Sequence, residues 1–121
     1  MAEHPRFEQL VADAKKHIQE ISPQETAASL KHGDTLLIDV RDADEWAEDH
    51  IPGAKNFTRG TLELEIEGAA PDLSTTIITH CGGGGRSALA AESLQRMGYQ
   101  NVKSMIGGLK GWKAAGLPTT K

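Results

Sequence analysis

A run of four consecutive glycines, Gly82–Gly85, places the strongest constraint on how this 121-residue chain can fold. Glycine loses more backbone freedom on folding than any other residue, so a globular protein keeps such a run where the chain must curl tightly or be approached closely. The apolar stretch 76–80 before the run is typical of a strand, and residues 87–97 after it have the pattern of a helix. The sequence therefore predicts a strand, a tight turn and a helix in direct succession.

The single cysteine, Cys81, lies where the predicted strand becomes the turn. Without side chains, the N–H groups of the glycines can converge on one point and form an anion-binding nest, and a helix that follows adds the positive end of its dipole. Free cysteine has a pKa of about 8.5, and helix N-termini or nearby cations lower it to roughly 3.5–7.5. We therefore predict that Cys81 is a thiolate nucleophile surrounded by backbone donors.

The spacing from Cys81 to Arg86 is C-x4-R, and this loop resembles the active-site loop of the rhodanese family of sulfurtransferases, C-x-x-G-x-R-S. Gly84, Arg86 and Ser87 occupy the matching positions. The related phosphatase and arsenate-reductase loops have one more residue, C-x5-R. A shorter ring suits a terminal sulfur on the cysteine, whereas the longer ring leaves room for a tetrahedral oxyanion. The loop length therefore favours sulfur transfer over phosphatase-like chemistry.

Two further segments strengthen the resemblance, which covers about residues 20–119. The family's N-terminal signature is matched by Asp39-Val40-Arg41, Glu45 and residues 50–54, and its closing pattern G-G…W…G-x-P is matched by residues 107–118. Because strand ends are where α/β sites gather, we expect Asp39 to orient Arg86 or the loop. Glu45 is either a helix-capping carboxylate or a partner for Arg86 or Arg41, so these residues are predicted to support the loop.

The resemblance implies that Cys81 is catalytic and that the loop binds the substrate through Gly82, Gly83, Gly84, Gly85, Arg86 and Ser87. Many family members carry a basic or polar side chain after the cysteine, but positions 82–85 here are all glycine, which leaves backbone dipoles and Arg86 as anion-binding groups. The Arg86 guanidinium either points at the donor or pairs with Asp39 or Glu45; the second arrangement is favoured because glycines cannot stiffen the turn. His80 precedes the cysteine in a strand, so its side chain is expected to project the opposite way.

The implied reaction moves sulfane sulfur in two steps, from thiosulfate or a persulfide to Cys81 and then to a cyanide, thiol or protein acceptor. The resemblance implies neither a metal nor an organic cofactor, and the histidines show no ligand spacing. An alternative is a sulfur carrier that is loaded and emptied by partner proteins. A phosphatase-like enzyme or an inert scaffold is a third possibility, disfavoured by the loop length and by the intact cysteine.

Strands and helices alternate along the chain, which predicts an α/β fold: a three-layer, rhodanese-like domain with a mainly parallel sheet. Residues 1–20 are predicted to hold an extra amphipathic helix, over about 6–19, and residues 21–121 the domain itself. Within that domain, Ser22–Glu25 reads as a helix-starting capping box and residues 35–40 as a strand buried on both faces. The stretch 59–67 is ambiguous by pattern, and the resemblance implies a short helix there.

The net charge of −4 provides no basic footprint for nucleic acid. No apolar run approaches the roughly 18–20 residues that span a bilayer, and the first residues lack the apolar core of a signal peptide. A lone cysteine excludes an internal disulfide. We therefore expect a cytoplasmic protein that acts on small sulfur compounds.

Overall fold

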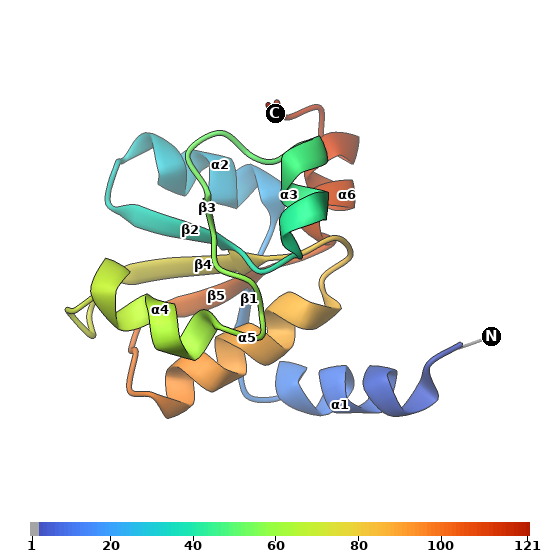
Figure 1. Cartoon of the computed structure of the whole chain (residues 1–121), viewed down its shortest axis with the longest axis vertical. Helices are drawn as coiled ribbons and strands as arrows, with labels where there is room; N and C mark the ends of the chain where they lie inside the picture. The colour runs from blue at the N-terminus through green and yellow to red at the C-terminus, as the bar shows by residue number, and fades with distance from the viewer. Residues whose placement is uncertain (1–2) are drawn as a thin grey trace.

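The computed structural model describes residues 3–121 and contains a five-stranded sheet at its centre (Figure 1). The strands are β1 (Gln19–Ile21), β2 (Thr35–Asp39), β3 (Lys55–Asn56), β4 (Thr76–His80) and β5 (Val102–Met105). Their order across the sheet is β1-β5-β4-β2-β3, and every neighbouring pair is parallel. The carboxyl ends of all the strands therefore meet at one edge, with β4 in the middle.

Helices cover both faces of the sheet, and together they form the predicted three-layer α/β fold. The helices are α1 (Pro5–Lys15), α2 (Pro23–Lys31), α3 (Ala43–Glu48), α4 (Leu62–Ala69), α5 (Gly85–Arg96) and α6 (Gly108–Ala114). Figure 1 shows α1, α4 and α5 below the sheet and α2, α3 and α6 above it. Helix α4 occupies the stretch that was ambiguous by sequence pattern and for which the family resemblance implied a helix.

The central strands supply the core on both sides because their side chains alternate between the two faces. Ile38 and Ile77 belong to the apolar cluster under α4 and α5. Leu37 and Ile78 belong to the cluster under α2 and α6, together with Trp112. Burial on both faces explains why these strands read as continuous apolar runs rather than as alternating ones.

The predicted helix over residues 6–19 was too long at its C-terminal end. Helix α1 stops at Lys15, and β1 follows at Gln19–Ile21, paired in parallel with Lys103–Met105 of β5. Ile18 and Ile21 fit a helical spacing, but Ile18 packs into the cluster under α5 and Ile21 into the cluster on the opposite face. Pairing with the sheet edge, which periodicity does not reveal, decides the conformation here.

The start of α2 follows the sequence prediction. The Ser22 hydroxyl accepts a hydrogen bond from the Glu25 N–H at 3.0 Å, and the Glu25 carboxylate accepts one from the Ser22 N–H at 3.2 Å. This reciprocal capping box satisfies two backbone donors that the helix itself leaves free. Across residues 3–121, no helix combines the length and apolar character needed to cross a membrane.

Candidate active site

The sulfur of Cys81 lies at the carboxyl end of the central strand β4, inside the loop that leads into α5. Its Sγ atom accepts hydrogen bonds from the N–H of Gly84 at 3.1 Å and from the N–H of Ser87 at 3.4 Å. The residue is 1% exposed. Two main-chain donors at the N-terminus of a helix therefore face the sulfur, as expected for a site that holds negative charge there.

The curl of the loop depends on a glycine in the left-handed region. Gly84, which caps α5, has a φ of +107°, a value that side-chain-bearing residues rarely adopt. The start of α6 holds the other side of the loop, because the N–H of Leu109 donates to the Cys81 carbonyl at 2.7 Å. A Cβ on Gly108 would overlap that carbonyl oxygen, so the two segments approach this closely only with glycine at 108.

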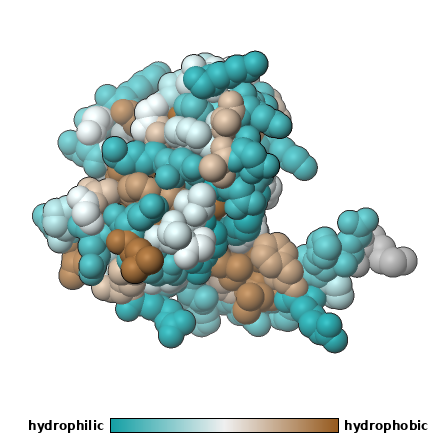
Figure 2. All heavy atoms as spheres, viewed as in Figure 1, coloured by the Kyte–Doolittle hydropathy of each residue, from teal (hydrophilic) through white to brown (hydrophobic). Residues whose placement is uncertain are grey.

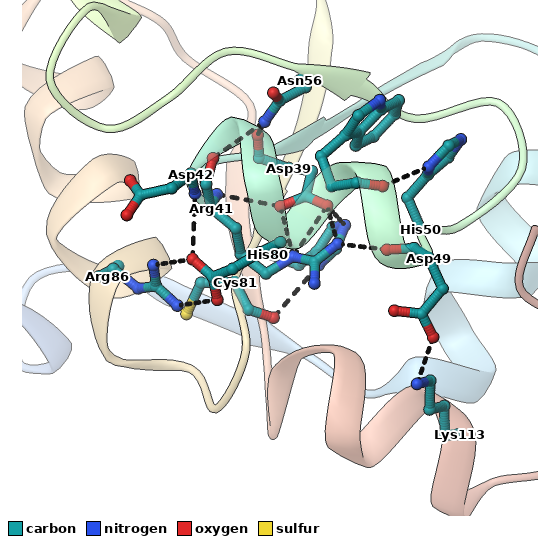
Figure 3. Close-up of polar contacts among 12 residues, drawn as sticks. Asp39, Arg41, Asp42, Asp49, His50, Asn56, His80, Cys81, Arg86 and Lys113 are labelled. Carbon is teal, nitrogen blue, oxygen red and sulfur yellow. Dashed lines mark hydrogen bonds and ion pairs between the residues drawn. The ribbon is translucent and has the colours of Figure 1, made fainter. Parts of the chain in front are cut away.

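Arg86 reaches toward α3, where it forms a two-pronged ion pair with Glu45 (Figure 3). The two nitrogen–oxygen distances are 2.8 and 3.1 Å. Glu45 also accepts a hydrogen bond from the Asp42 N–H at 3.1 Å, so it serves both of the roles considered for it. Hydrogen bonding to Arg86 is the main reason that the pKa of Glu45 falls to about 2.

Asp39 binds Arg41 rather than Arg86, which corrects one of the two pairings considered for the arginine. Nη2 of Arg41 lies 2.8 Å from Oδ2 of Asp39, and its Nε lies 3.0 Å from Oδ1. Both residues are buried, and Arg41 also donates to the Asp49 carbonyl at 2.7 Å (Figure 3). Asn56 closes this cluster by donating to the carbonyls of Asp39 and Arg41 at 3.0 Å each. The cluster fixes the turn from β2 to α3, and α3 carries Glu45.

His80 packs against this cluster and is fully buried. Its Nε2 atom lies 3.6 Å from Oδ2 of Asp39 and has no hydrogen-bond partner among residues 3–121. Burial lowers the pKa of His80, and the Asp39 carboxylate opposes that effect only in part. The ring is therefore neutral at pH 7, and its role is to pack against Asp39 in the interior next to the site.

The buried, neutral His80 predicts a loss of stability in acid. The unfolded chain takes up a proton near pH 6.5, whereas the folded chain does so only at lower pH, so the free energy of unfolding falls as the pH drops below about 6.5. The contribution of one such proton is at most about 1.4 kcal/mol per pH unit. In urea unfolding between pH 7 and 5, we expect the His80→Gln variant to show a shallower decline than the wild type.

A control variant at an exposed histidine, His17→Asn, should reproduce the wild-type decline. Equal slopes for His80→Gln and the wild type would contradict the assignment. If the glutamine variant does not fold, the ring signals of His80 in the wild type provide the same test, because burial lowers the pKa of His80 and the midpoint of their titration should therefore lie below that of a free histidine.

Sequence reasoning missed Ser104, whose hydroxyl lies 2.9 Å from that of Ser87. Ser104 comes from β5 and is 1% exposed, so its hydroxyl proton needs an acceptor within the protein. When Ser104 donates to Ser87, the Ser87 proton is left for the Gly84 carbonyl, at 3.3 Å, and the Ser87 hydroxyl oxygen accepts a hydrogen bond from the Cys81 sulfur at 3.6 Å. Ser104 thus holds the Ser87 hydroxyl in place beside the sulfur. No sequence signal marks it, because it lies in an ordinary buried strand.

For the sulfur transfer that the family resemblance implies, we expect Ser104→Ala to slow the loading of Cys81 about three- to tenfold, since one oriented hydrogen bond near the reacting charge is weakened. The measurement is the second-order rate of persulfide formation. A double-mutant cycle with Ser87→Ala tests whether Ser104 acts by positioning the Ser87 hydroxyl or by a general effect on the fold. If it acts through Ser87, Ser104→Ala should have little further effect on the rate in the Ser87→Ala background. Additive losses in the cycle would refute a role exerted through Ser87.

Among residues 3–121, no group of three or more His, Cys, Asp and Glu side chains is arranged to hold a metal ion.

Comparison with known proteins identifies the family. Residues 22–115 match the model of the rhodanese-like domain. The chain belongs to the rhodanese family. The thiosulfate sulfurtransferase GlpE of Haemophilus influenzae is 39% identical over 100 residues, which cover 83% of this chain and 92% of GlpE. The predicted family, its fold and the assignment as a rhodanese-type sulfurtransferase are thereby confirmed.

Two solved structures resemble the rhodanese chain over nearly its whole length. One is a Rhodopseudomonas palustris protein of unknown function, described as a possible tyrosine phosphatase, with a TM-score of 0.83, 32% identity and 94% and 93% of the two chains covered. The other is the polysulfide-sulfur transferase homodimer of Wolinella succinogenes, with a TM-score of 0.82, 29% identity and 96% and 88% coverage. Both matches cover more of this chain than the family model does.

Proposed function

We propose that this rhodanese moves sulfane sulfur from thiosulfate or a persulfide to a thiol or cyanide acceptor through a persulfide on Cys81. The observation that carries the proposal is the pair of N–H groups, from Gly84 and Ser87, that point at the sulfur. Fixed main-chain dipoles need no rearrangement when charge develops on the bound sulfur, so they stabilise it as an oxyanion hole stabilises oxygen.

In the loading step, the Cys81 thiolate attacks the outer sulfur of the donor and forms a sulfur–sulfur bond. The bond within the donor breaks, and its electron pair leaves with sulfite when the donor is thiosulfate, or with a thiolate when the donor is an organic persulfide. The enzyme is left as Cys81–S–S⁻, so both atoms and charge balance. No proton has to move, and the step needs no general base.

In the unloading step, cyanide or a thiolate attacks the terminal sulfur of the persulfide. The Cys81 thiolate is released, and thiocyanate or a new persulfide leaves. Since the enzyme alternates between two covalent forms, the kinetics are expected to be ping-pong. Arg86 takes no direct part in either step, because Glu45 engages its guanidinium; its proposed role, with Asp39 and Arg41, is to hold the loop in place.

A reducing compartment such as the cytoplasm suits this chemistry, because the lone Cys81 must remain reduced between turnovers. The acceptor there is proposed to be a thiol on a small molecule or on a protein.

The decisive experiment is the mass of the intact protein after incubation with thiosulfate. We expect a gain of one sulfur atom, which a reducing thiol removes. No gain with thiosulfate or with a persulfide donor would overturn the proposal. Loading without appreciable turnover to cyanide would instead indicate a sulfur carrier that serves partner proteins.

A further inference from the structure

A groove of about 390 Å³ runs between helix α1 and the glycine loop, outside the ring of atoms around Cys81. Residues of α1 line one side of the groove, and the backbone of Gly83, Gly84 and Gly85 lines the other. Its volume falls within the range of about 300–1,000 Å³ that is usual for small-molecule sites. Gly84 belongs to both the groove and the catalytic nest, because its N–H donates to the Cys81 sulfur.

The α1 wall lies directly against the loop. The Phe7 ring packs on the backbone of Gly85, where an added Cβ would lie 3.0 Å from Cε2 of Phe7, and Val11 lies beside it. Phe7 nevertheless remains 41% exposed, so part of the ring faces the groove. Figure 2 shows hydrophobic side chains gathered over α1, next to the start of α5. The groove therefore presents an apolar surface within reach of the active-site loop.

Two of the residues that line the groove are charged, Glu8 and Lys15. They are seven positions apart on α1, which places them on one face of the helix and about 10 Å apart along its axis. Lys15 lies 3.7 Å from Glu20, but both side chains are partly exposed, and such pairs contribute little. Lys15 can therefore exchange this weak contact for a ligand carboxylate, while Glu8 favours an ammonium group at the other end.

We propose that this groove binds the organic part of a small amino-acid-derived persulfide or thiol, an inference that rests on the proposed sulfur transfer. The ligand's carboxylate lies at Lys15, its ammonium group at Glu8 and its carbon chain on Phe7, and its sulfur reaches Cys81 past the glycines. In the loading step the donor RSS⁻ gives its terminal sulfur to the Cys81 thiolate and leaves as RS⁻. The glycine loop fits this role, because residues 82–85 have no side chains that would place charge or bulk between the groove and the sulfur.

The test compares two persulfide donors, glutathione persulfide, which carries both charges, and the persulfide of β-mercaptoethanol, which lacks them. The readout is the ratio of kcat/KM for the first donor to kcat/KM for the second. We expect Lys15→Gln to lower this ratio about three- to fivefold, the size of one partly exposed charge interaction. Glu8→Gln should lower it by a similar factor, mainly through KM.

A matched control is Lys16→Gln, which removes a lysine next to Lys15 that is more exposed and outside the groove. This variant should keep the wild-type ratio. A second pair compares Phe7→Ala with Leu10→Ala, an exposed apolar residue of the same helix that does not line the groove. Only Phe7→Ala should raise KM for glutathione persulfide.

Equal ratios in the wild type, Lys15→Gln and Lys16→Gln would overturn the assignment of the groove. So would equal losses with Lys15→Gln and Lys16→Gln, which would indicate general attraction of anions by α1. Either result leaves the proposed function intact as long as Cys81 still gains a sulfur atom, whereas failure to load Cys81 from any donor would refute the proposed function itself.

Discussion

Sulfur transfer is expected to be lost when Cys81 is replaced by serine, with turnover falling at least about a thousandfold. An oxygen in place of the sulfur cannot form the persulfide on which both half-reactions depend. Serine is close in size to cysteine and would still meet the N–H groups of Gly84 and Ser87, so the fold should be kept. The measurements are thiosulfate–cyanide turnover and the mass of the intact protein after incubation with thiosulfate.

The control for this variant is its thermal unfolding, which should remain close to that of the wild type. A Cys81→Ser protein that still turns over, or still gains the mass of one sulfur atom, would show that the assigned nucleophile is wrong. Loss of activity together with loss of the fold would be uninformative for serine, and Cys81→Ala then serves as the second variant, with the same expected outcome.

The second large effect is expected from Gly84→Val. Gly84 has a φ of +107°, and a β-branched residue is held there only with strain of about 1–3 kcal/mol. Relief of that strain turns the backbone, which moves the Gly84 N–H away from the Cys81 sulfur. Since a misplacement of about 1 Å can reduce a rate about a hundredfold, we expect a loss of at least that size in kcat/KM for the folded protein.

Gly33→Val separates strain from the loss of the donor. Gly33 follows α2 and has a φ of +80°, and no atom of the described residues 3–121 lies within 4 Å of a Cβ added there. A valine there should lower the free energy of unfolding by a similar amount but leave the activity per folded molecule unchanged. If Gly84→Val and Gly33→Val destabilise the protein equally and both remain fully active, the main-chain nest around Cys81 is not what makes the site work.

The active-site loop was readily predicted from the sequence because its signals are local. A lone cysteine, a glycine run and an arginine at a defined spacing describe one continuous segment, and the turn and the helix start follow from backbone sterics and helix-end hydrogen bonding. The capping box at Ser22 is of the same kind. The dual role of Glu45 was only partly foreseen, since its bond to the Asp42 N–H is local while its pairing with Arg86 spans the distance from α3 to α5.

What the sequence determined by itself was the buried central strands and the succession of strand, glycine loop and helix around Cys81, because each rests on neighbours within a few residues. Only the tertiary structure decided that residues 19–21 leave the helix to join the sheet, that Asp39 binds Arg41, and that Ser104 stands behind Ser87. It also decided that Phe7 packs on Gly85 and makes α1 one wall of a groove. These contacts join segments far apart in the chain, and their partners are selected by packing and burial, which leave no periodic or spacing pattern to read.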